Sequence, residues 1–139
     1  MATTQRPTMP RSPRSRDRST DLTLAIRVSS SVLLIDSGHG EEATFTALLE
    51  AGRPPFWWCD SAEFALPAGP IGTLILKNPA GLASRDQGVL FDWITRHPAT
   101  QIITVASQPL YPLVQAGTFA ADLYYRLNTF MIKRRPSRE

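Results

Sequence analysis

Apolar residues recur along the chain in short runs that alternate with segments of helical spacing. The short runs predict strands at 31–36, 55–60, 72–77, 100–107 and 129–132. Segments with apolar residues on one face predict helices at 41–52, 85–97 and 118–127, with a short helix or turn at 110–117. Residues 21–28 predict another short strand or the lead into one. Nearly continuous apolar strands that alternate with helices predict an α/β fold, with a parallel sheet covered on both faces.

Both ends of the chain are basic and differ in composition from the body at 21–132. Residues 1–20 hold three prolines, one acid and five arginines, which predicts a disordered basic tail. Residues 133–139 hold four basic residues and one glutamate and form a second basic tail. The tails carry +4 and +3 and the whole chain carries +3, so the body carries −4. Such tails predict weak, non-specific binding to nucleic acid, and the alternative is a solvated tail without a dedicated partner.

Length and composition exclude several classes of protein. A chain of 139 residues fits one domain with a modest core. No apolar run is long enough to cross a bilayer, and the N-terminus lacks the apolar centre of a secretory signal. The single cysteine, Cys59, excludes an internal disulfide and a cysteine-based zinc site, and His39 and His97 lack partners at metal-ligand spacing. We therefore expect a cytoplasmic protein without membrane contact and without a metal site.

The segment "DSGHGEEA" (36–43) follows a predicted buried strand and leads into a helix. This is where an α/β nucleotide-binding protein has its phosphate loop, which needs glycines and a lysine. The sequence predicts a degenerate nucleotide loop made of Ser37, Gly38, His39, Gly40, Glu41 and Glu42. Glu41 occupies the lysine position, so carboxylates stand where triphosphate charge would lie. The alternative is an ordinary helix N-terminus with acidic residues in its first turn.

Two residue pairs offer weaker candidates. Asp36 and Asp60 each end a predicted strand, where open α/β sheets bind ligands, and could act as paired carboxylates. Trp57 and Trp58 could stack on bases, although one of them is expected in the core.

Several stretches together resemble the central AAA+ domain of bacterial sigma-54-dependent transcription activators of the NtrC type. The most specific is "GTFAADLYYRLN" (117–128), which matches that family's Gly-x-Phe-Arg-x-Asp-Leu-Tyr-Tyr-Arg-Leu-Asn in register. Residues 31–52 are similar to its Walker A strand, loop and helix, and residues 72–94 to its Walker B strand and the following helix. The resemblance covers about residues 28–132. It implies a P-loop NTPase-like, doubly wound parallel sheet of about five strands, with the lid subdomain absent.

The departures from the family pattern concern its chemistry. Where the family has the acidic pair of Walker B, this chain has Lys77 and Asn78. The resemblance makes Ser107 sensor-like and Arg126 the second of two trans-acting arginines, while Ala120 replaces the first. It therefore implies a degenerate ATPase without catalytic residues, with no cofactor expected and ATP and magnesium bound only if the loop still binds them. The short connection between the strands at 55–60 and 72–77 leaves no room for the family's sigma-54-contacting loop.

These observations lead to one function hypothesis and its alternatives. We expect a sigma-54 activator-like module in transcription regulation that does not hydrolyse ATP and acts by contacting AAA+ relatives or the transcription machinery. In the first alternative the chain is a weak ATP-binding regulator with residual ATPase. In the second it binds nucleic acid non-specifically through its basic tails, and in the third it is a decayed fragment without function. For Arg126, the alternative to a partner contact is a local ion pair with Asp122.

Overall fold

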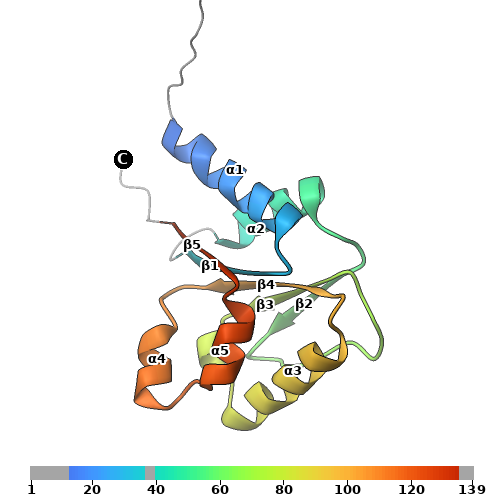
Figure 1. Ribbon diagram of the computed structural model, residues 1–139, viewed down its shortest axis with the longest axis vertical. Coiled ribbons are helices and arrows are strands. Elements are labelled where there is room, and N and C mark those ends of the chain that lie inside the picture. Colours follow the sequence, from blue (N-terminus) through green and yellow to red (C-terminus); the bar gives the residue numbers. More distant parts are fainter. Residues whose placement is uncertain (1–12, 37–39, 135–139) are drawn as a thin grey trace, which may run out of the picture.

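The computed structural model describes residues 13–36 and 40–134 and shows one parallel sheet with helices on both faces (Figure 1). The strands lie in the order β2-β3-β4-β1-β5. Their bounds are β1 (Ser31–Asp36), β2 (Phe56–Asp60), β3 (Thr73–Lys77), β4 (Gln101–Ala106) and β5 (Phe130–Arg134). The helices are α1 (Pro13–Val28), α2 (Gly40–Ala51), α3 (Ser84–Arg96), α4 (Tyr111–Ala116) and α5 (Ala121–Leu127), with a 3-10 helix η2 (Pro79–Gly81).

The two central strands explain why their sequences are apolar without alternation. Every residue of β1 and β4 is buried, because helices cover both faces of the sheet at these positions. β1 pairs with β4 on one side and with β5 on the other, and both pairings are parallel. The prediction of a doubly wound parallel sheet is confirmed.

Two separate cores form, one on each face of the sheet. On one face α1 and α2 pack against β1, β3 and β4, with Ile26, Leu48 and Ile103 among the buried side chains. On the other face α3, α4 and α5 pack against the sheet, with Trp93 and Leu123 among the buried side chains. Figure 1 shows these two helical layers above and below the sheet.

The N-terminal part of the chain differs from the sequence-based expectation. Residues 21–28 are helical, so the predicted strand is wrong, and the helix extends back to Pro13 through part of the predicted disordered tail. Leu22, Ala25 and Ile26 are buried while Leu24 is exposed, a pattern that a helix produces and an alternating strand does not. The amide of Gln101 on β4 donates to the carbonyl of Ser29, 2.8 Å away, just after this helix ends. Residues 1–12 lie outside the described part of the chain.

The C-terminal strand is longer than expected. β5 includes Lys133 and Arg134, which were assigned to the basic tail, because its pairing with β1 continues to the pair Asp36 and Arg134. Residues 135–139 lie outside the described residues. In the described part of the chain, no helix has the length and apolar character needed to cross a bilayer.

The connection from β2 to β3, at 61–72, is short and contains no helix. It is fixed by hydrogen bonds to its carbonyl groups. The indole of Trp57 donates to Ala65 at 3.0 Å, the indole of Trp93 donates to Pro67 at 3.1 Å, and the hydroxyl of Thr100 donates to Ile71 at 2.9 Å. The connection therefore lies against the layer that contains α3, and an inserted loop does not project from it.

Candidate functional site

The carboxyl ends of the parallel strands meet along one edge of the sheet, and the predicted site residues Asp36, Asp60, Lys77, Asn78 and Ser107 lie there. The end of β3 lies between the ends of β2 and β4, and the end of β1 follows that of β4. In register, Asp60 pairs with Lys77, and Ile35 pairs with Ala106. Open α/β sheets bind ligands at this edge, which makes it the candidate functional site.

Lys77, at the predicted degenerate Walker B position, ends β3 and contacts residues of β2. Its ammonium nitrogen lies 3.8 Å from a carboxylate oxygen of Asp60 and 5.9 Å from the ring centroid of Trp58. Both side chains of the ion pair are partly exposed, so the pair contributes at most about 1 kcal/mol to stability. An ammonium group has no lone pair to offer a metal ion. The end of β3 therefore presents a positive charge instead of a metal ligand.

Asn78 serves the backbone turn after β3. Its φ of 55° and ψ of 52° are left-handed, a conformation that asparagine adopts more readily than most residues. Its N–H donates to the carbonyl of Val105, 3.1 Å away, and its carbonyl accepts from Gly81 at 3.1 Å. These contacts direct the chain into η2, and the side chain of Asn78 is exposed.

The described part of the chain contains Gly40, Glu41 and Glu42 of the predicted nucleotide loop. Ser37, Gly38 and His39 lie outside the described residues. Gly40 begins α2 directly after this gap, and Glu42 is exposed in the first turn. The helix thus begins where a phosphate loop would lead into it, with an acidic residue in its first turn.

Ser107 and Asp36 also lie at this edge of the sheet. Ser107 follows β4 and is exposed, and its side chain forms no hydrogen bond with a described residue. Asp36 is buried at the end of β1. Since β3 and β4 lie between β1 and β2, Asp36 and Asp60 are separated by about 14 Å at the usual strand spacing. The predicted carboxylate pair is therefore wrong.

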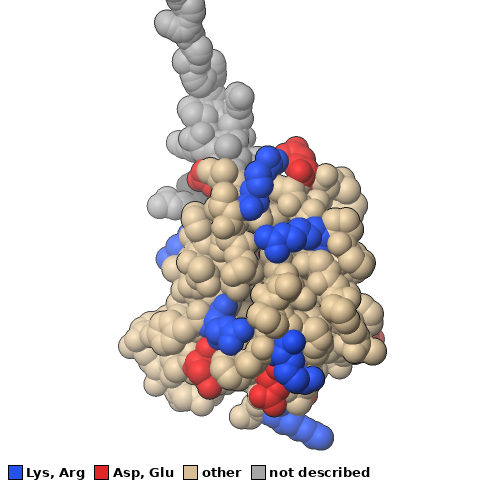
Figure 2. Space-filling view, turned by 45° about the vertical axis from the view of Figure 1, so that its right-hand side comes forward, with Lys and Arg blue, Asp and Glu red and all other residues tan. Residues whose placement is uncertain are grey.

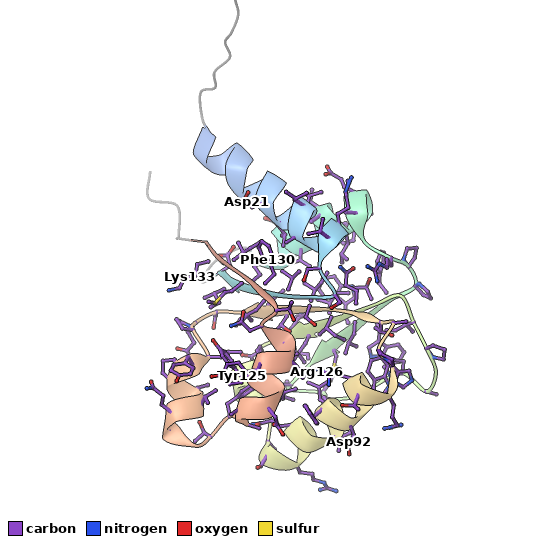
Figure 3. All side chains as sticks on the ribbon, viewed as in Figure 1. Asp21, Asp92, Tyr125, Arg126, Phe130 and Lys133 are labelled. Atoms are coloured by element: carbon purple, nitrogen blue, oxygen red, sulfur yellow. The ribbon has the colours of Figure 1, made fainter. Side chains whose placement is uncertain are left out.

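Arg126 extends from α5 toward α3 (Figure 3). A guanidinium nitrogen donates to the hydroxyl of Thr95 at 3.3 Å, and the guanidinium carbon lies 5.6 Å from the ring centroid of Phe91. Among the described residues, Arg126 and Asp122 form no ion pair, and a carboxylate oxygen of Asp122 accepts from the N–H of Leu123 at 2.7 Å. The local ion pair considered as an alternative is therefore not formed, and Arg126 contacts the neighbouring helix.

The two tryptophans of β2 lie on opposite faces of an edge strand. Trp57 and Trp58 are 37% and 40% exposed, so the expectation that one of them is in the core is wrong. The sequence could not show this, because the apolar run 55–60 does not reveal whether its strand is central or at an edge. The buried residue of this strand is Cys59, and burial raises the pKa of its thiol.

No three His, Cys, Asp or Glu side chains among the described residues are grouped so that they could hold a metal ion. His97 has a structural contact instead. Its ring stacks on Trp93 with the centroids 4.1 Å apart, and Nδ1 lies 2.8 Å from the carbonyl of Trp93.

Comparison with known proteins gives both sequence and fold relatives. The chain is 32% identical over 106 residues to the nitrogen fixation protein VnfA of Azotobacter vinelandii, a match that covers 73% of the chain and 20% of VnfA. NtrX from Brucella abortus, solved in complex with ADP, superimposes with a TM-score of 0.74 at 16% identity, covering 91% of this chain and 36% of NtrX. The P-loop NTPase domain of the sigma-54 transport activator from E. coli gives a TM-score of 0.61 at 19% identity and covers 92% of this chain and 99% of that domain.

The chain has the fold of the P-loop NTPase domain of this sigma-54 activator and is related in sequence to VnfA. It spans a fifth or less of the length of the curated relatives that it matches. No protein-family model matches the chain.

In this fold, the stretch that carries the sequence resemblance, residues 117–128, contributes four side chains to the core. Its buried side chains pack between α3 and the sheet and are Phe119, Leu123, Tyr124 and Leu127. Gly117 ends α4 with a φ of 84°, which a side chain would strain. Asn128 donates a hydrogen bond from its amide to the hydroxyl of Tyr124 at 3.0 Å. These contacts stabilise the fold, and the charged members of the stretch are Asp122, which is exposed, and Arg126, which is partly exposed.

Sequence reasoning missed Gln87, which positions that stretch. The buried amide group of Gln87 on α3 donates to the carbonyls of Leu82 and Thr118 at 3.0 Å each, and its oxygen accepts from the N–H of Ala120 at 2.8 Å. A polar residue on an amphipathic helix is usually exposed, so its burial gave no signal in the sequence. Gln87 links the start of α3 to the start of α5 and so helps to orient Arg126.

Proposed function

We propose that this chain is a regulatory AAA+ module in transcription that does not hydrolyse ATP and acts by protein contact. The observation that supports this best is the end of β3, where Lys77 and Asn78 stand. ATP hydrolysis by this fold needs a carboxylate to hold magnesium and a group to orient or activate water. Here the strand end supplies an ammonium group bound to Asp60 and an amide exposed at a turn. The glutamate at the position of the phosphate-binding lysine, Glu41, adds to the same argument from the sequence.

The link to transcription rests on the relatives. One structural relative is the P-loop NTPase domain of a sigma-54 activator, and the fold of this chain matches that whole domain. A module with this fold and without the chemistry of hydrolysis acts through its surface. We therefore take AAA+ activator relatives and the transcription machinery as its partners.

Arg126 is the side chain that we assign to contact with such a partner. Its single 3.3 Å hydrogen bond to Thr95 and its partly exposed position over Phe91 hold it weakly, each contact being worth about 1 kcal/mol or less. Arg126 can therefore exchange Thr95 for a phosphate or carboxylate of another subunit without loss of the fold. In a mixed assembly it would reach the nucleotide site of an intact relative and disturb its catalysis.

Two measurements test this proposal. Purified chain with ATP and magnesium should release phosphate at the rate of a protein-free blank, while an active sigma-54 activator domain assayed in parallel shows turnover. Titrating the chain into that active domain should lower the activator's ATPase, and Arg126→Ala should remove the inhibition. Arg96→Ala is the matched control, since Arg96 is an exposed arginine in the last turn of α3.

The outcomes separate the alternatives. Turnover by the chain itself would replace this proposal with a weak ATP-binding regulator. No inhibition at a large molar excess, with folded protein confirmed by circular dichroism, would contradict the contact through Arg126. Binding to nucleic acid through the basic tails is a separate alternative, which would show as steeply salt-dependent retardation of any DNA sequence.

A further inference from the structure

The outer edge of β2 is an open strand edge with apolar side chains. The neighbour of β2 in the sheet is β3, and the other side of β2 has no strand among the described residues. The carbonyl of Pro55 accepts from Thr73 at 3.1 Å and the N–H of Ser61 donates to Lys77 at 3.3 Å, so odd-numbered residues bond to β3. By alternation, Phe56, Trp58 and Asp60 direct their backbone groups outward.

Two of these three residues are available for pairing. The carbonyl of Asp60 accepts from the N–H of Glu63 at 3.0 Å, which closes that end of the edge. The backbone N–H and C=O groups of Phe56 and Trp58 have no partner in the described part of the chain. Native proteins usually protect such an edge with charged residues, proline or a bulge. Pro54 and Pro55 precede β2 and Asp60 ends it, so the unprotected part of the edge is the stretch from Phe56 to Cys59.

The side chains around this edge form one apolar surface, which we call the β2 edge surface and define as Phe45, Leu49, Phe56 and Trp58. Cys59 packs in the core with α3, so Phe56 and Trp58 face the side of the sheet that carries α2. Phe45 and Leu49 share a stripe of α2 with Gly52, and Phe56 packs against Gly52 so closely that a Cβ there would lie 3.0 Å from its ring. All four side chains are exposed. Figure 2 shows a surface on which charged side chains are few and scattered among wide uncharged areas.

The charges at the two ends of β2 indicate which partner fits. Arg53 is exposed just before the strand. At the other end Asp60 is paired with Lys77, and Glu63 is an exposed acid beside it. A second copy of β2 in antiparallel orientation brings Arg53 of each copy toward Glu63 of the other, so this pairing of opposite charges occurs twice. The same two-fold arrangement places each β2 edge surface against its counterpart, as an isologous interface requires.

We propose that the chain forms a two-fold symmetric dimer through antiparallel pairing of β2 with β2 of a second copy. The outward-facing backbone N–H and C=O groups of Phe56 and Trp58 fix the register. Phe56 of each copy forms a hydrogen-bonded pair with Trp58 of the other, which gives two such pairs. Trp57 then lies opposite Trp57 of the second copy in the central non-hydrogen-bonded pair, where Cα atoms are about 4.5 Å apart. The dimer has one continuous sheet, and it depends neither on nucleotide nor on Arg126.

Sedimentation of the full chain tests the interface. We expect wild-type protein to sediment as a dimer at micromolar concentration, and Phe56→Lys to raise the dissociation constant at least roughly tenfold by placing a charge in the apolar surface. Phe130→Lys is the matched control and should remain dimeric. Phe130 also begins an edge strand and is 44% exposed, compared with 36% for Phe56. A monomeric wild type, or dissociation by Phe130→Lys and not by Phe56→Lys, would overturn the proposal.

Cross-linking tests the register. Cysteines opposite each other at this spacing are within the Cα range of a disulfide, so Trp57→Cys should give a covalent dimer under mild oxidation. Wild type should not, because Cys59 is buried and burial raises the pKa of its thiol. Phe130→Cys should not cross-link either. A wild-type dimer in which Trp57→Cys fails to cross-link while folded would reject the proposed register. Since both assays omit ATP and the activator, their results do not depend on those of the proposed function.

Discussion

The layer formed by α3 and α5 and the carboxyl edge of the sheet differ in what their residues do. In the layer, the sequence that resembles sigma-54 activators fills the core, with Phe119 and Leu123 buried against the sheet. At the edge, the residues that depart from the family pattern, Lys77 and Asn78, are partly or fully exposed. Packing thus preserves the fold in one region, while in the other the end of β3 carries an ammonium group and an amide. The difference teaches that the residues that hold the fold are not those that would carry chemistry, so substitutions in the two regions should differ in their effect on stability.

The largest effect on stability should come from a cavity in the layer formed by α3 and α5. Leu123→Ala removes a fully buried side chain at the centre of α5 and should lower the free energy of unfolding by about 2–5 kcal/mol. Tyr125→Ala on the same helix is the control, because Tyr125 is mostly exposed, and it should cost well under about 1 kcal/mol. Urea unfolding followed by circular dichroism measures both. Equal losses would mean that α5 is not packed as described.

A smaller effect should follow from removing the polar link within the layer. Gln87→Ala leaves two carbonyls and one N–H without their partner and should cost about 1–3 kcal/mol. Gln115→Ala is the control, since Gln115 is exposed on α4. If Gln87→Ala unfolds at the same urea concentration as Gln115→Ala, then the link does not stabilise the layer.

The smallest effect on stability should come from a substitution at the carboxyl edge of the sheet. Lys77→Ala breaks a partly exposed ion pair with Asp60 and should change the free energy of unfolding by about 1 kcal/mol or less. Because Lys77 has no catalytic role in the proposed function, phosphate release should stay at the blank. A loss comparable to that of Leu123→Ala would show that the edge is structural, and the contrast between the two regions would disappear.

The same contrast explains what the sequence could predict. The apolar runs that alternate with helical segments correctly predicted the parallel sheet. Leu33 is buried on one face of the sheet and Ile103 on the other, so the central strands are apolar without alternation. The helix at 21–28 was missed because Leu22, Leu24 and Ile26 also fit a strand, and only contact with the sheet decides between them. The contact of Arg126 with Thr95 joins residues far apart in the chain, and no local pattern signals it.

Single-turnover hydrolysis tests the central claim most directly. Chain in molar excess over ATP labelled in its γ-phosphate, with magnesium, exposes a single slow catalytic event that steady-state assays miss. We expect labelled phosphate to appear no faster than in a protein-free blank, because the end of β3 supplies Lys77 and Asn78 in place of carboxylates. Magnesium-dependent release that disappears in Arg126→Ala would contradict the account.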